Sequence, residues 1–269
     1  MVTAPAWRHP DRVAPLTAHS RAPERAPGHA PPRLDVLDGP STFSVRLAEV
    51  DRDLIAPLDD DYADTAALHL VAPLVHLATG TWDPGEHGRR FDGWFGMLIV
   101  GGLLIRRVEI DGLRCCELLG PGDLLRPWDE DGGDASLATQ ASWRVVEPSR
   151  VALLDAAFAR RACRWPTVVA ELMHRSLVRS RTQSVLLAAT QARRADVRLR
   201  TLFWHLADRW GRMTPDGVRI ELSLTHQVIS QLTGLRRPTV SLNLAKLEAT
   251  GEIVRVTRSE WLIRRAAAS

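Results

Sequence analysis

The chain has little cysteine, no long apolar run and none of the short motifs that mark common enzymes. Its 269 residues include three cysteines, too few for a disulfide scaffold or for the four thiolate ligands of an iron–sulfur cluster. No stretch approaches the roughly 18 apolar residues of a membrane helix, and the N-terminus lacks the apolar core of an export signal. We find no nucleophile–base pair, no HExxH zinc spacing and no phosphate-binding glycine loop. These absences predict a cytoplasmic protein that is not an enzyme, binds no metal and does not enter a membrane.

Positive charge is concentrated at the C-terminal end. Residues 191–269 hold 14 Lys and Arg against 7 Asp and Glu, whereas residues 1–190 hold 21 against 25. A basic domain attracts the phosphates of nucleic acid and binds them in a salt-dependent way. The distribution therefore indicates a C-terminal domain that binds DNA.

The segment from Leu224 to Glu248 predicts two short helices joined by a glycine turn. Thr225 can cap the first helix through its hydroxyl, and Gly234 supplies the positive φ of a tight turn. Pro238 lies in the first turn of the second helix, where a missing N–H costs nothing. Apolar residues at helical spacing give each helix a buried face: Val228, Ile229, Leu232, Val240, Leu244 and Leu247.

Four polar residues remain on the outward side of the second helix: Arg236, Arg237, Thr239 and Ser241. A guanidinium group pairs with the O6 and N7 atoms of guanine, and hydroxyls bond to phosphate oxygens. The positive N-terminus of the helix also favours an anionic backbone. These residue types predict a helix that enters a major groove.

The flanking segments predict a winged helix. Residues 218–222 alternate as a strand after a turn at Thr214–Gly217, and residues 253–263 form a hairpin pattern. The whole segment resembles the DNA-binding domain of the Crp/Fnr family of transcription regulators, and residues 196–207 match the helix that precedes it there. The resemblance implies that Arg237 contacts a base and Thr239 a phosphate. Eight residues are predicted to bind DNA: Thr225, Gln227, Arg236, Arg237, Thr239, Ser241, Lys246 and Arg258.

Two positions depart from the family pattern. Leu242 stands where a basic, base-reading residue is common, which implies an altered or weaker sequence preference. Asn243 stands where the family buries an aliphatic residue, so its amide must be satisfied locally.

Short strands and glycine turns fill the middle of the chain. We expect strands at 97–100, 103–109, 113–119, 141–146 and 150–155, with a type I′ turn at Asp111–Gly112. This pattern predicts an antiparallel, jelly-roll-like β-roll. It resembles the sensor domain of the same family, so the predicted fold class is α+β, with a β-roll sensor, a long dimerisation helix and a C-terminal winged helix-turn-helix.

The signature that binds a cyclic nucleotide in that family is incomplete here. Gly122–Asp123 is present, but Leu124–Pro127 replaces the segment with the ribose-binding glutamate, and Thr139–Ser142 has no arginine for the cyclic phosphate. We therefore expect no control by cyclic AMP and predict no cofactor. A pocket for another effector could involve Leu125, Arg126, Gln140 and Ser142. Haem on His69, His76 or His87, another small ligand, a protein partner, or constitutive activity stay open as alternatives.

Residues 165–192 predict one long helix with an imperfect heptad seam at Trp165, Val169, Leu172 and Leu186, interrupted by Ser176, Arg179 and Gln183. The resemblance implies that this helix forms a homodimer on an inverted repeat; its alternative is a helix packed on its own roll. The predicted domains are a disordered leader (1–34), or a wrongly assigned start, the β-roll (35–160), the long helix (161–194) and the winged helix (195–269).

Double-stranded DNA and a second copy of the chain are the predicted partners, with RNA polymerase as a further candidate. The alternative function is a module that uses the winged helix to bind protein or RNA, with a purely structural β-roll. Binding that is specific for a palindromic duplex and falls steeply with salt separates the first reading from the second.

Overall fold

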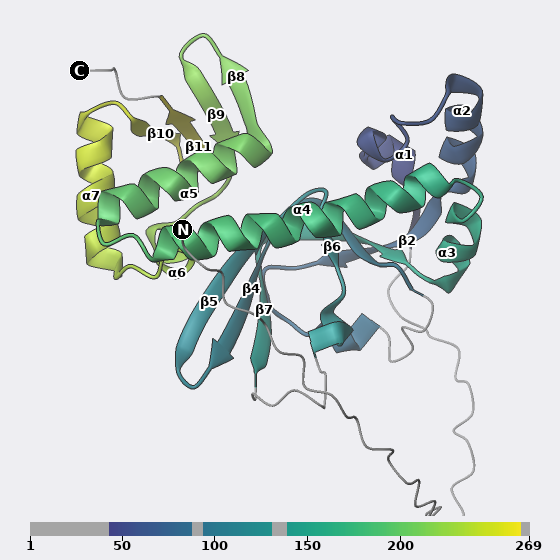
Figure 1. The fold of residues 1–269 in the computed structure, drawn as a ribbon, viewed down its shortest axis with the longest axis horizontal. Helices are drawn as coiled ribbons and strands as arrows, with labels where there is room; N and C mark the ends of the chain where they lie inside the picture. Colours follow the sequence, from purple (N-terminus) through teal and green to yellow (C-terminus); the bar gives the residue numbers. More distant parts are fainter. Residues whose placement is uncertain (1–42, 88–93, 131–138, 265–269) are drawn as a thin grey trace, which may run out of the picture. The chain divides into compact units, whose positions relative to one another are not determined.

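The computed structural model describes residues 43–87, 94–130 and 139–264. The predicted leader, residues 1–34, lies outside these ranges. The described residues belong to one compact unit. It contains an antiparallel β-roll, a long helix and a small α/β domain, so the predicted α+β class is confirmed (Figure 1).

Seven antiparallel strands form the roll. They pair in the order β1-β2-β7-β4-β5, with β3 added to β7 and β6 added to β4. Their bounds are β1 (Phe43–Arg46), β2 (Val71–Leu77), β3 (Gly80–Trp82), β4 (Gly96–Ile110), β5 (Leu113–Leu119), β6 (Leu124–Leu125) and β7 (Gln140–Leu154).

Two of the strands are longer than the sequence predicts. The pairs expected at 97–100 and 103–109, and at 141–146 and 150–155, are the single strands β4 and β7, each of 15 residues. Their pairing register shifts between Ile99 and Leu104, so the strands continue through a bulged bend. Gly102 makes the bend, because its φ is +84° and a Cβ there would lie 2.4 Å from the Pro148 carbonyl oxygen. The sequence suggested a break because glycine often ends a strand.

The turn between β4 and β5 is as predicted. Asp111 and Gly112 both have positive φ, +48° and +79°, which a type I′ turn requires. The register from Leu104–Leu119 to Ile110–Leu113 is unbroken.

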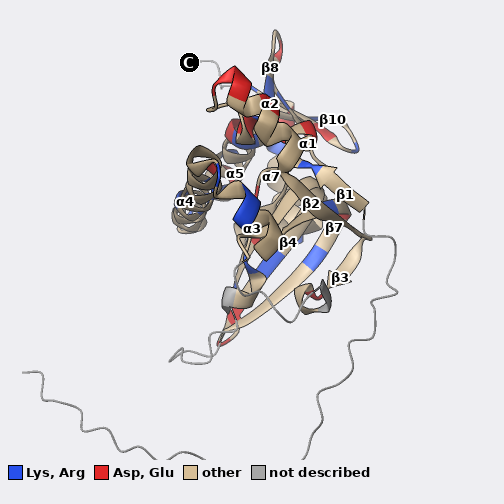
Figure 2. Ribbon diagram, turned by 90° about the vertical axis from the view of Figure 1, so that its right-hand side faces the viewer, with Lys and Arg blue, Asp and Glu red and all other residues tan. Residues whose placement is uncertain are grey.

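Helices cover one side of the roll. They are α1 (Leu47–Val50), α2 (Asp60–His69), α3 (Ala156–Ala162) and α4 (Pro166–Thr190), with the short 3-10 turns η1 (Arg52–Leu54), η2 (Pro84–His87) and η3 (Pro127–Glu130). The acidic side chains of α2 are Asp60, Asp61 and Asp64 (Figure 2). α4 crosses the roll from α3 towards the C-terminal domain (Figure 1).

The C-terminal domain is a winged helix. Its elements are α5 (Ala195–Trp210), β8 (Gly211–Thr214), β9 (Gly217–Glu221), α6 (His226–Thr233), α7 (Arg237–Ala249), β10 (Ile253–Thr257) and β11 (Glu260–Ile263). The strands pair in the order β10-β11-β9-β8. The predicted strand, two helices and hairpin are all present.

The core of the winged helix continues into the roll. Phe203, Ile220 and Val228 belong to the same buried cluster as Leu103 and Leu118 of β4 and β5. Two further clusters fill the inside of the roll and the space between the roll and α1–α4. The domain boundaries at 160/161 and 194/195 stay predictions. Within the described ranges, no helix is long and apolar enough to span a bilayer.

Candidate nucleic-acid interface

The turn between α6 and α7 has the expected capping chemistry. The Thr225 hydroxyl accepts a hydrogen bond from the Val228 N–H at 3.2 Å, which caps α6. Gly234 is left-handed with φ 67°. The Ser230 hydroxyl donates to the Leu235 carbonyl at 2.6 Å and closes the turn. α7 then begins at Arg237, with Pro238 in its first turn.

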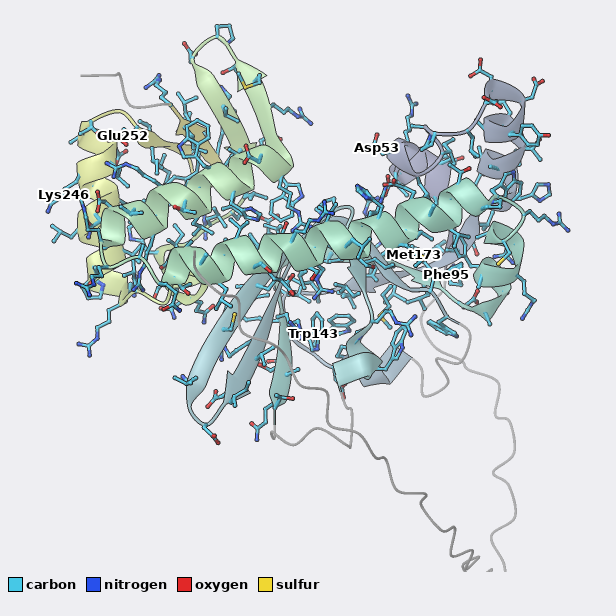
Figure 3. All side chains as sticks on the ribbon, viewed as in Figure 1. Asp53, Phe95, Trp143, Met173, Lys246 and Glu252 are labelled. Atoms are coloured by element: carbon cyan, nitrogen blue, oxygen red, sulfur yellow. The ribbon has the colours of Figure 1, made fainter. Side chains whose placement is uncertain are left out.

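The eight predicted DNA-binding residues lie on α6, α7 and the β10–β11 turn. Six are exposed: Thr225, Gln227, Arg236, Arg237, Lys246 and Arg258. Thr239 and Ser241 are half-buried. The Arg236 carbonyl accepts a hydrogen bond from the Val240 N–H at 3.0 Å. Within the part of the chain that the structure describes, neither the Arg236 nor the Arg237 guanidinium group forms a hydrogen bond or an ion pair. Lys246 lies on the outer side of α7 (Figure 3). The guanidinium pair at the start of α7 is therefore open to solvent.

His226 joins the two helices and was not among the predicted residues. Its Nδ1 shares a hydrogen bond of 2.7 Å with the Ser241 hydroxyl on α7. Burial lowers the pKa of His226, and the positive charges of Arg255 and Arg237 lower it further. The lowered pKa favours the neutral imidazole, in keeping with its place among the cations of this surface. The only sequence signal for it is its place directly after the capping Thr225.

The two residues of α7 that depart from the family pattern, Leu242 and Asn243, have different surroundings. The Asn243 side-chain amide donates to the Thr239 carbonyl one turn earlier, at 2.9 Å, so the predicted local satisfaction is confirmed. Leu242 is 59% exposed.

A network of charges holds α7 against α5. Arg200 of α5 bonds to Glu252, which follows α7, at 2.6 Å and to Asp196 at 2.6 Å. Hydrogen bonds from Arg194 and Arg200 lower the pKa of Asp196 to about 2. Hydrogen bonds from Arg200 and Thr250 also lower the pKa of Glu252. Both shifts favour the charged carboxylates that pair with Arg200.

The predicted effector residues are not gathered in one cavity. Leu125 is fully buried in the roll core, and Arg126 is exposed and donates to the Trp94 carbonyl at 2.9 Å. Gln140 is exposed at the start of β7. Ser142 does line a cavity of about 280 Å³.

That cavity lies where both parts of the nucleotide signature would be. Its lining residues include Pro127 and Trp128 from the first part and Ala141 and Ser142 from the second, together with Trp82 and Trp143. The Trp82 and Trp143 rings meet edge to face at 5.8 Å. Among the described residues that line the cavity, the charged side chain is that of Asp83. Among these described residues, a cyclic phosphate would find a negative charge and no cation.

An ion-pair network fixes α4 to the roll. Arg179 donates to both oxygens of Glu117 on β5 at 2.8 Å, and the Gln183 amide donates to the same carboxylate at 2.8 Å. Burial alone would raise the pKa of Glu117, but the contacts with Arg179, Gln183 and Arg106 outweigh it and lower the pKa. Arg179 and Gln183 are thus contacts from α4 to the roll.

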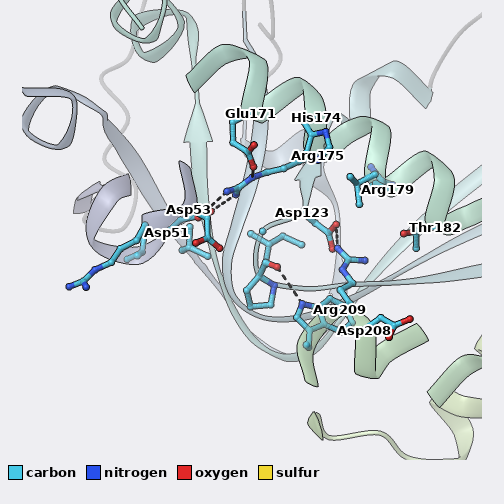
Figure 4. A pocket seen from close by; sticks show the side chains of 18 of the residues that line it. Asp51, Asp53, Asp123, Glu171, His174, Arg175, Arg179, Thr182, Asp208 and Arg209 are labelled. Carbon is cyan, nitrogen blue, oxygen red and sulfur yellow. Dashed lines mark hydrogen bonds and ion pairs between the residues drawn. The ribbon is translucent and has the colours of Figure 1, made fainter. Parts of the chain in front are cut away.

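A larger cavity of about 730 Å³ lies between α4, α5 and η1 (Figure 4). Its charged side chains are largely paired with one another. Arg175 bonds to Asp51 and Glu171, and Arg209 bonds to Asp123. No group of three metal-ligand side chains occurs in the described ranges.

The C-terminal domain matches a known protein family. Residues 197–268 match the model of the Crp-like helix-turn-helix domain. The chain is 39% identical over 90 residues to the regulatory protein CysR of Synechococcus elongatus. The matched residues make up 32% of this chain. The match spans 44% of the length of that relative.

Solved structures with the same fold cover most of the chain. FixK2 from Bradyrhizobium japonicum has a TM-score of 0.52 at 16% identity, covering 72% of this chain and 93% of FixK2. A cyclic nucleotide-binding domain containing protein from Listeria monocytogenes has a TM-score of 0.54 at 14% identity, covering 80% and 97%. At these identities the likeness establishes the fold.

Proposed function

We propose that this chain is a Crp/Fnr-type transcription regulator that binds a specific duplex DNA site with α7 in the major groove. The match of residues 197–268 to the Crp-like helix-turn-helix domain and the 39% identity to part of CysR support this proposal. The observation that carries the proposal is the pair of exposed guanidinium groups at the start of α7, which have no partner among the described residues. We assign Arg237 to a guanine and the hydroxyls of Thr225, Thr239 and Ser241 to phosphates or bases. Further contacts to the DNA phosphate backbone come from Gln227, Arg236, Lys246 and Arg258.

We assign the dimer contact to the exposed face of α4. The heptad residues predicted from the sequence do not face outward. Trp165 and Leu172 are buried in the chain's own core, and Leu186 packs on the winged helix. A different row is exposed at alternating spacings of three and four residues: Ala170, Met173, Leu177, Ser180, Ser184 and Leu187. Such a row is the a/d pattern of a two-stranded coiled coil. It supports a homodimer on an inverted repeat.

We propose that cyclic AMP does not control this regulator. The roll cavity has three tryptophans and Asp83 among its described lining residues, and a buried cyclic phosphate without a cation is costly. A small effector of another kind, if one acts, would bind the DNA-competent arrangement more tightly than the alternative. The 730 Å³ cavity beside α4 and α5 offers the larger space.

One experiment tests the function and the nucleotide dependence together: selection of bound sequences from random duplex DNA, with and without cyclic AMP. We expect a palindromic site whose half-sites are about one helical turn apart, the same site in both conditions, and a steep loss of affinity with salt. Lys246 is the only lysine of the sequence, so DNA should protect this side chain from an amine-reactive label. A module that binds protein would show no enriched sequence and no protection by DNA.

A further inference from the structure

α7 is apolar on two sides. Its buried side consists of Val240, Leu244 and Leu247. Its outward strip consists of four exposed apolar residues: Pro238, Leu242, Ala245 and Ala249. At about 100° per residue these four share one face. None of them joins an apolar cluster of the described residues. The helix therefore presents an apolar strip, with Leu242 as its one large side chain, to whatever it meets.

Polar and cationic groups border the strip. Ser241 lies on one side and Thr239 and Lys246 lie on the other, by the same helical geometry. Arg236 and Arg237 stand at its N-terminal end, and the acidic Glu248 stands near its C-terminal end. The strip is thus placed in the middle of the surface that we assign to DNA. Its positive border complements phosphates and would disfavour a cationic or purely apolar partner.

The major groove offers one apolar group to such a strip. This group is the 5-methyl of thymine, which cytosine and uracil lack. A leucine side chain on a groove-facing helix can displace water from that methyl but cannot bond to the polar edge of any base. Leu242 lies roughly 7.5 Å along α7 from Arg237, or about two base-pair steps.

We propose that Leu242 reads the 5-methyl group of a pyrimidine in each half-site, with Pro238 and Ala245 completing the apolar contact. The inference rests on the proposed DNA-binding function and adds a specificity determinant to it. Arg237 would select a guanine, and Leu242 would select a methylated pyrimidine about two steps away. Thymine supplies this methyl in ordinary DNA, and 5-methylcytosine would supply the same group.

The test replaces thymines of the selected site by deoxyuridine, one symmetric pair at a time, with the full-length protein. Loss of one buried methyl contact should weaken binding about four-fold per half-site, or about sixteen-fold for a symmetric site. We expect this penalty at one thymine per half-site. At that position a duplex with 5-methylcytosine should bind more tightly than a duplex with cytosine, and equal binding of the two would contradict reading of the methyl group.

Variants of Leu242 locate the contact. Leu242→Ala should remove the deoxyuridine penalty, whereas Leu242→Met should retain it. Leu113→Ala, at a leucine that is 75% exposed at the start of β5 against 59% for Leu242, is the control and should leave the penalty unchanged. Equal affinity of native protein for thymine and deoxyuridine duplexes, or a penalty that survives Leu242→Ala, overturns the inference. In both cases selective, salt-dependent binding would still stand, so the DNA-binding proposal is judged separately. A protein that binds no duplex overturns both.

Discussion

Arg237 stands at the first turn of α7 with its guanidinium group exposed and unpaired within the described ranges. Removing this side chain should leave the fold unchanged and take away one base contact. We expect Arg237→Ala to weaken binding to the selected site by about 1–3 kcal/mol, with a much smaller effect on scrambled duplex. Fluorescence anisotropy with both duplexes at one salt concentration measures the ratio.

Arg212→Ala is the control for that substitution. The Arg212 side chain is 81% exposed on β8, in the same domain but away from α7, and its loss should change neither affinity. If Arg237→Ala weakens specific and scrambled duplex equally, Arg237 contacts a phosphate and not a base.

Single residues with a local role were predictable from the sequence. The Thr225 cap, the left-handed Gly234 and the Asp111–Gly112 turn depend on neighbours a few positions away. The contact between His226 and Ser241 was not predictable, because it depends on how α6 packs across α7. The residues expected to line an effector pocket failed to converge for the same reason, since burial of Leu125 is decided by the whole roll.

At the scale of elements, α4 shows why the length of a helix is easier to predict than which of its sides packs against which partner. Its predicted range of 165–192 agrees closely with Pro166–Thr190. Apolar residues occur on several of its sides, however, and periodicity alone could not assign each side to a partner. Three sides serve different contacts: Leu172 packs on the roll, Arg179 bonds to Glu117, and Leu177 faces solvent.

The exposed side of α4 leads to a prediction about assembly. Leu177 is 60% exposed in the middle of the row that we assign to the dimer. A glutamate there would place like charges across a coiled-coil seam. We expect Leu177→Glu to shift the protein towards monomer at micromolar concentration, measured by sedimentation velocity, and to weaken binding to the palindromic site.

Leu68→Glu is its matched control, because Leu68 on α2 has the same 60% exposure. It should leave the mass and the DNA affinity of the native protein unchanged. A native protein that sediments as a monomer, or a Leu177→Glu variant with the mass of the native dimer, contradicts the assignment of this face.

At the scale of the whole molecule, the roll and the winged helix are joined by polar contacts as well as by a shared core. Arg209 of α5 bonds to Asp123 in the turn before β6, and the Ser223 N–H donates to Glu147 of β7 at 2.7 Å. The sequence predicted both parts but not these contacts, which join residues about 80 positions apart. Because the cluster around Phe203 includes Leu103 and Leu118, we expect the two parts to unfold together.

Loss of the Arg209 side chain should weaken the junction between the roll and the winged helix. Asp123 is 3% exposed, so Arg209→Ala leaves a buried carboxylate without its cation, which costs about 3–5 kcal/mol. We expect a lower urea midpoint, and a heat-unfolding curve that separates into two transitions where the native protein has one. Adding Asp123→Asn should restore part of the loss, because no charge is then left buried. Asp208→Ala, at the exposed neighbouring position of α5, should leave both curves in place. A native protein with two calorimetric transitions would show that the roll and the winged helix unfold independently despite their common core.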